Sequence, residues 1–202
     1  MEYNLWPLVG AVLLLCTPSY LFFASRIRRC IVELALSGGF PLLGIARPWH
    51  NWLDLARGFG GTFLLYHHVF ELDPQAEEYM QELGVVAGVL ALALLLNTFY
   101  RRRKHLYCIA PIFLVTGIAM VTFDWWIVLY GVAAGAVSGR LSDSPEMALI
   151  VMGLVVGAFG YFFAGLSLML LLTCALIVLP VVYAFTTNRN LAAPSCISST
   201  DE

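Results

Sequence analysis

Charged side chains are scarce in this sequence. Of its 202 residues, 12% are charged and 60% are hydrophobic. A soluble domain carries about 25% charged residues, because they cover the surface that faces water. Most of this protein's surface must therefore face something other than water, and the composition predicts an integral membrane protein.

Lysine and paired cysteines are also lacking. The only lysine is Lys104, and no long basic stretch is suited to holding a nucleic-acid backbone, so we expect no nucleic-acid partner. A retinal protein would need a lysine within its last helix, which this sequence does not supply. The five cysteines include no C-x-x-C pair, and we interpret them as structural. Walker, G-x-S-x-G and H-E-x-x-H motifs are absent as well.

What the sequence has in abundance is long apolar runs. About twenty apolar residues span the hydrocarbon core as a helix. The runs are Leu5–Ser25, Trp49–Phe70, Leu83–Tyr100, Leu106–Phe123, Trp125–Gly139, Met147–Ala164 and Leu166–Phe185. The last two must form a tight hairpin that turns at 164–167. The sequence therefore predicts an all-α fold, a polytopic transmembrane bundle of about seven helices over residues 1–185. The polar residues 186–202 are expected to form a short disordered cytoplasmic tail.

The segment 30–46 is ambiguous. It is apolar, but Gly38, Gly39 and Pro41 interrupt it in a way that breaks a helix. If it crossed the membrane, the basic cluster 101–104 would lie outside, whereas basic residues beside helix ends stay cytoplasmic. We therefore interpret this segment as an interfacial or re-entrant element between the first two helices, on the cytoplasmic side.

With that choice the N-terminus lies outside and the C-terminus in the cytoplasm. All eleven basic residues then lie on the inner side, and the acidic residues between the second and third helices lie outside. Tryptophans would form an aromatic belt at each interface. The outer belt contains Trp6, Trp125 and Trp126, and the inner belt contains Trp49 and Trp52.

Glycines recur at intervals of four in three of the predicted helices. Small residues at this spacing let helix backbones approach closely in lipid. The candidate packing residues are Gly131, Gly135 and Gly139, then Gly84 and Gly88, then Gly153 and Gly157. They would pack either within this bundle or against a partner subunit.

A histidine pair closes the second predicted helix. His67 and His68 precede Glu71 and Asp73, and Asp124 lies in a neighbouring outer loop. These side chains could form a metal or tetrapyrrole site, or a site that handles protons. Two observations favour the simpler alternative of polar residues at the outer interface. Polar groups cost little there, and adjacent helical side chains point about 100° apart.

Four other polar residues fall inside or beside the predicted helices. Asp54 and Arg57 are three residues apart, so we expect an ion pair between them. Arg47 and Arg57 could instead hold an anionic headgroup or phosphate. Asn97 lies in the third helix, and we expect it to donate a hydrogen bond to another helix.

The predicted interior is apolar, which favours a protein whose task is to pack. The leading hypothesis is a non-catalytic integral subunit or assembly factor of a larger complex of the bacterial inner membrane. Its partners would be the lipid bilayer and other membrane subunits or further copies of itself. The alternatives are a small transporter or permease component, and a membrane enzyme or metal or tetrapyrrole binder with the outer-face histidine site.

Overall fold

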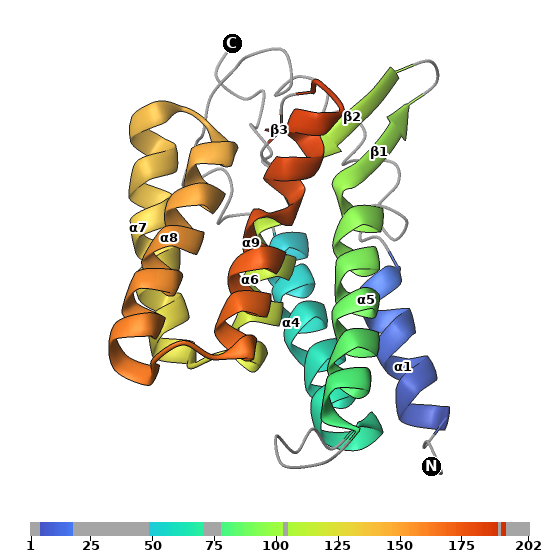
Figure 1. Ribbon diagram of the computed structural model, residues 1–202. Coiled ribbons are helices and arrows are strands. Elements are labelled where there is room, and N and C mark those ends of the chain that lie inside the picture. The colour runs from blue at the N-terminus through green and yellow to red at the C-terminus, as the bar shows by residue number, and fades with distance from the viewer. Residues whose placement is uncertain (1–4, 18–48, 71–77, 103–104, 190, 193–202) are drawn as a thin grey trace.

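The computed structural model describes most of the chain as helix (Figure 1). The described residues are 5–17, 49–70, 78–102, 105–189 and 191–192. The predicted interfacial or re-entrant segment, 30–46, lies outside them.

Seven α-helices are described, one for each predicted apolar run. They are α1 (Leu5–Cys16), α4 (Trp49–Leu64), α5 (Tyr79–Thr98), α6 (Ile112–Thr122), α7 (Trp125–Ser142), α8 (Pro145–Ala164) and α9 (Leu168–Thr186). A single π-helical segment, η2 (Leu65–Val69), continues α4.

Three of these helices are long and apolar enough to cross a membrane. They are α5, α8 and α9, with 20, 20 and 19 residues. Because about twenty residues match the hydrocarbon thickness, they establish the membrane character that the composition predicts. α1 and α6 are apolar but shorter over the described residues.

The predicted start of the fourth span, Leu106, is wrong. The run Leu106–Phe123 was expected to be one helix, but its first residues belong to strand β2 (His105–Ile109). β2 pairs antiparallel with β1 (Phe99–Arg102), so α5 also ends two residues earlier than predicted. Pro111 then begins α6, which has 11 residues and is about 16 Å long. The all-α expectation is therefore corrected by a small sheet at one end of the bundle.

The sheet includes part of the predicted disordered tail, 186–202. Strand β3 (Leu191–Ala192) pairs parallel with β2, with Cys108 opposite Leu191. The backbone N–H of Leu191 donates to the carboxylate of Glu146 at 2.5 Å, and Ser144 donates to the same carboxylate. The first turn of α8 thus holds the chain just after α9, while residues 193–202 lie outside the described part of the chain.

The predicted hairpin between the last two helices is confirmed. Gly165 ends α8 with a φ of +76°, a conformation that glycine adopts without strain. Ser167 caps α9 by accepting a hydrogen bond from the backbone N–H of Leu170 at 3.1 Å. Pro180 lies inside α9.

The helices pack chiefly as two close pairs, α4 with α6 and α7 with α8 (Figure 1). In the first pair, a Cβ on Gly58 would lie 2.5 Å from the carbonyl oxygen of Leu114, and one on Gly117 would lie 2.3 Å from that of Leu55. Such distances leave no room for a side chain, so the two backbones are in direct contact.

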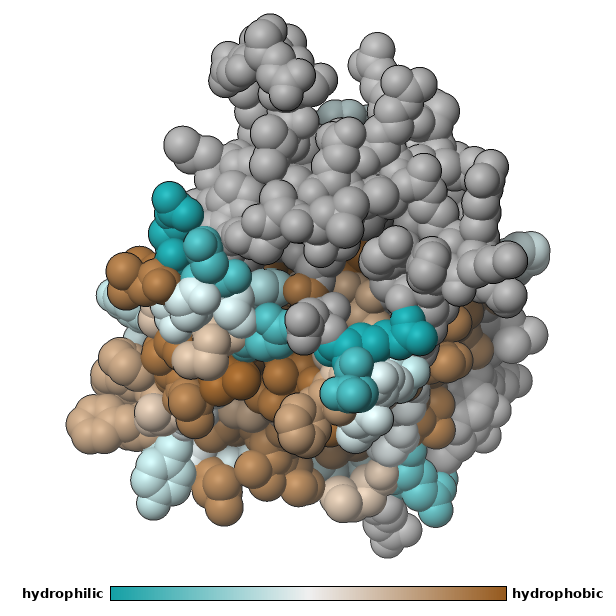
Figure 2. Space-filling model, turned by 90° about the horizontal axis from the view of Figure 1, so that it is seen from above, coloured by the Kyte–Doolittle hydropathy of each residue, from teal (hydrophilic) through white to brown (hydrophobic). Residues whose placement is uncertain are grey.

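α6 is the most enclosed of these helices. Seven of its 11 residues are buried, and α9 covers it on another side. A view from the end that carries the sheet shows apolar side chains over much of the visible described surface (Figure 2). In a membrane protein the apolar sides of the helices are solvated by lipid, so burial inside the bundle must be driven by packing rather than by escape from water.

The close α4–α6 contact predicts different outcomes for two Gly→Ala substitutions. Gly117→Ala should lower the stability by about 1–3 kcal/mol, because its methyl group overlaps the carbonyl of Leu55. Gly84→Ala should leave it unchanged or raise it by up to about 1 kcal/mol, since nothing lies within 4 Å. Thermal unfolding in detergent, followed by circular dichroism, measures both. Equal melting temperatures for the two variants would contradict the contact.

Candidate functional site

The predicted histidine pair lies in η2, the π-helical continuation of α4. Both His67 and His68 are exposed. Each ring contacts that of Phe63, with centroids 4.6 Å apart for His67 and 6.0 Å for His68. Phe63 also stacks on Phe59 one turn earlier. The imidazoles therefore continue an exposed row of aromatic rings along α4. The π-helical segment that contains both histidines is itself a feature that is frequent at functional sites.

The acidic residues predicted for this site are not gathered around the histidines. Glu71 and Asp73 lie outside the described residues. Asp124 is exposed at the start of α7, where its backbone carbonyl accepts hydrogen bonds from Ile127 and Val128. Among the described residues, no three His, Cys, Asp or Glu side chains lie close enough to hold a metal ion.

Arg57, predicted to pair with Asp54 or to hold an anion, makes three contacts within the protein. Its Nη1 donates to the Asp54 carboxylate at 2.5 Å, so the predicted ion pair is present. Its Nε donates to the carbonyl of Leu14 at 2.9 Å, and its Nη2 donates to the carbonyl of Thr17. Arg47, the second residue of the predicted anion site, lies outside the described residues.

The contacts of Arg57 complete the end of another helix. The last carbonyls of any helix lack partners within it. At the end of α1, Arg57 supplies donors from α4, and Asn97 supplies one from α5 to the carbonyl of Leu15 at 2.9 Å. The predicted interhelical hydrogen bond of Asn97 is therefore confirmed. A partly buried polar cluster joins α1, α4 and α5.

The predicted glycine stripes meet different surroundings. Gly131 and Gly135 lie against α8, and a Cβ on Gly135 would come within 2.5 Å of the carbonyl oxygen of Ala148. Gly139 is buried at the end of the same helix. On α8, Gly153 and Gly157 face α9. These two stripes pack inside the protein.

The third stripe has no neighbour. A Cβ added to Gly84 or Gly88 of α5 would meet nothing within 4 Å. Large apolar side chains on the same side of the helix are exposed as well, namely Val85, Leu92 and Leu96. We call these five residues the open face of α5. It combines a glycine stripe with apolar side chains, and no described element covers it.

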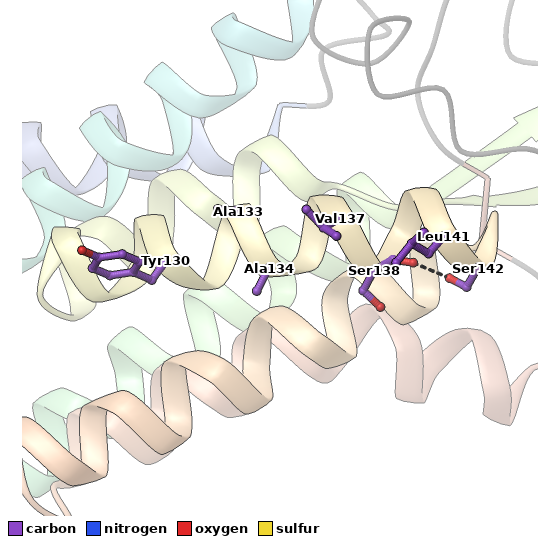
Figure 3. A pocket seen from close by; sticks show the side chains of 7 residues that line it. All are labelled: Tyr130, Ala133, Ala134, Val137, Ser138, Leu141 and Ser142. Atoms are coloured by element: carbon purple, nitrogen blue, oxygen red, sulfur yellow. Dashed lines mark hydrogen bonds between the residues drawn. The ribbon is translucent and has the colours of Figure 1, made fainter.

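A second surface lies on the outward side of α7. All seven residues that line it come from this helix, with Tyr130 at one end and Ser142 at the other (Figure 3). The hollow has a volume of about 680 Å³ and is broadly open. Small residues line it between these two ends, Ala134 and Ser138 among them. The ring of Tyr130 stacks on that of Phe159 from α8, with centroids 5.9 Å apart.

The described cysteines agree with a structural role. Cys16, Cys108 and Cys174 are free and at least partly buried. Cys108 lies on β2, where burial raises the pKa of its thiol, and a hydrogen bond with Thr187 and the charge of Arg189 partly offset that rise. A thiol of raised pKa has little nucleophilic thiolate at neutral pH.

Comparisons with known proteins add no assignment: no family model, curated protein or solved structure matches the chain.

Two features were missed by the sequence analysis. One is the capping role of Arg57, which depends on residues forty positions away. The other is an apolar cavity between the two helix pairs. Neither leaves a local pattern in the sequence, although the three glycines that follow Arg57 do indicate close packing there.

The buried position of Arg57 predicts a large effect of its removal. Arg57→Met should lower the stability by about 3 kcal/mol, because it takes a partner from Asp54 and from two helix-end carbonyls. Arg140→Met is the matched control. The Arg140 pair with Asp143 is 3.5 Å long and both side chains are more than half exposed, so its loss should cost less than about 0.5 kcal/mol.

Thermal unfolding of both variants in the same detergent measures the difference. If Arg57→Met melted within a degree or two of Arg140→Met, the capping role of Arg57 would be wrong.

Proposed function

We propose that this protein is a non-catalytic integral subunit or assembly factor of a larger complex of the bacterial inner membrane. The observation that supports this most is the open face of α5, which is built for contact with a helix and has none within the described chain. Its partners would be other membrane subunits or further copies of this protein.

In lipid, the effect of a glycine on helix stability and packing depends on whether it faces acyl chains or another helix. A glycine that faces acyl chains gains nothing over a larger apolar residue and weakens its helix. A glycine at a helix contact lets the partner backbone approach, which strengthens packing. In the pairs α4–α6 and α7–α8, glycines serve that contact. On α5 the same spacing at Gly84 and Gly88 therefore favours a helix from another chain.

The outward surface of α7 supports a second lateral contact. It presents small residues at four-residue spacing beside the exposed aromatic rings of Tyr130, Phe159 and Phe163. Aromatic residues are enriched at protein interfaces. A subunit with two such surfaces on different helices could join two neighbours within one membrane complex.

The interior favours this role over that of a transporter. Four of the five buried threonine hydroxyl groups among the described residues form hydrogen bonds within the protein, and that of Thr62 has no partner there. Those of Thr98 and Thr116 donate to carbonyls one turn earlier in their own helices. Thr173 of α9 bonds the hydroxyl of Thr122 at 2.9 Å and so joins α9 to α6.

Lateral association is tested by extracting the tagged protein from its own membranes in polymer-bounded lipid discs. Gly88→Leu should reduce the recovered partner by at least tenfold, because leucine holds the helices apart at the open face. Gly60→Leu is the matched control, since a Cβ at Gly60 of α4 also meets nothing within 4 Å. Mass spectrometry of the discs measures the partner in each sample.

The control separates loss of contact from loss of fold. Gly135→Leu would not serve, because this glycine packs against α8 inside the protein. Recovery of the wild-type chain alone, or equal partner recovery by Gly88→Leu and Gly60→Leu, would contradict the proposal. Two differently tagged copies recovered in one disc identify the partner as a second copy of this chain.

We also propose that all seven helices cross the membrane, with the N-terminus outside and the C-terminus in the cytoplasm. The sheet end of the bundle carries the described basic residues Arg101, Arg102, Arg140 and Arg189. Acidic residues such as Glu82 lie at the opposite end, where α5 begins. The position of these arginines supports the orientation, because basic residues remain cytoplasmic while acidic residues contribute little to it.

Reporter fusions test the orientation. Green fluorescent protein fused after residue 202 should fluoresce, and alkaline phosphatase fused there should be inactive, because the C-terminus is cytoplasmic. Fused after Gly165, at the end of α8, the two reporters should give the reverse result. The same result at both positions would overturn the proposed crossing of α9.

A further inference from the structure

A cavity of about 340 Å³ lies between the two close helix pairs. α4 and α6 form one wall, and α7 and α8 form the other. The pairs are each tight because of their glycines, but α6 and α7 touch each other much less. The cavity is the space that two rigid pairs leave where they meet.

The lining is almost entirely apolar. It includes Leu55, Met120, Leu149 and Met152. The hydroxyl of Thr116 also lines it, but that group already donates to the carbonyl of Ile112 at 2.8 Å. A stable internal water needs two to four polar partners, so this lining favours an apolar occupant over water.

The cavity has exposed residues in its lining. Trp52 of α4 and Leu129 of α7 each line it and are more than 40% exposed, at 54% and 42%. Trp52 makes an edge-to-face contact with Phe113, 5.4 Å between centroids, across the α4–α6 pair. An apolar molecule in the surrounding bilayer can therefore reach the interior. The acyl chains of phospholipids are the apolar groups present there at the highest concentration.

We propose that this cavity is a binding site for one acyl chain of a bilayer phospholipid. A water molecule takes about 30 Å³, and a methylene group is of similar size, so the cavity has room for roughly ten methylene groups. Trp52 would lie beside the glycerol region, because the indole group favours the boundary between acyl chains and headgroups. The proposal does not depend on the association function proposed above.

Photolabelling by a phospholipid with a diazirine on one acyl chain tests the site. The full-length protein is reconstituted in vesicles of phosphatidylcholine and phosphatidylglycerol that contain a small fraction of this lipid, then irradiated and sequenced by mass spectrometry. Met152 is only 2% exposed, so the surrounding bilayer cannot reach it. Labelling of Met152 together with Leu154, which is 66% exposed on the same helix, is the expected result. Labelling of Leu154 without Met152 would overturn the proposal.

A pair of substitutions on α7 strengthens the test. Ala136 lines the cavity, whereas Ala133 lines the outward hollow of the same helix. Ala136→Phe should reduce the labelling of Met152 at least fivefold by filling the cavity, and Ala133→Phe should leave it unchanged. Equal labelling in the two variants would show that the chain reaches Met152 by another route and would contradict the site.

A third sample determines whether the bound acyl chain belongs to a phospholipid or to a free fatty acid. In it, the labelled phospholipid is replaced by a free fatty acid that carries the same diazirine. Stronger labelling of Met152 by the phospholipid than by the fatty acid at equal membrane concentration is expected. The reverse order would overturn the phospholipid as the occupant.

Discussion

The contact between the backbones of α4 and α6 is the constraint on which the rest of the structure depends. Gly58 and Gly117 have no side chains to separate the helices, and each faces a carbonyl of the opposite helix. That contact encloses α6, an 11-residue helix that is about half as long as the hydrocarbon core is thick. The α7–α8 pair repeats the arrangement through Gly131 and Gly135. Because packing drives helix association in lipid, two such pairs provide stable units that α9 and α5 can then join.

The existence and order of the helices could be predicted from the sequence, because each requires a long apolar run and the runs are separated by charge, proline or glycine. The hairpin at Gly165 and the ion pair of Asp54 with Arg57 followed from spacing alone. The start of α6 did not. The residues from Leu106 to Cys108 lie in an apolar run, yet they pair with β1. That pairing depends on a strand that the apolar pattern does not distinguish from the end of α5.

The roles of the glycines and of Arg57 could be assigned only from the three-dimensional structure. Spacing shows that Gly84, Gly88, Gly131 and Gly135 each lie in a stripe, but not whether a stripe meets a helix of the same chain. The structure separates them: the stripe of α7 packs inside, and that of α5 is open. Arg57 was expected to pair with Asp54 or to hold an anion with Arg47, and neither expectation included its capping of α1. The cavity arises where the α4–α6 and α7–α8 pairs pack against each other, and no local sequence pattern indicates that packing. The proposed function depends on these surfaces rather than on a sequence motif.

Solid-state NMR can detect the contact between the backbones of α4 and α6. Protein labelled with ¹³C in glycine alone is measured in lipid bilayers, and Gly117→Ala identifies the signals of that residue. A Cβ on Gly117 would lie 3.2 Å from the carbonyl carbon of Gly58. Direct contact of the two helices therefore predicts a carbon–carbon correlation between the Cα of Gly117 and that carbonyl at short mixing times. If this correlation is absent while correlations within each glycine are strong, the two backbones are apart and the direct contact of α4 with α6 is wrong.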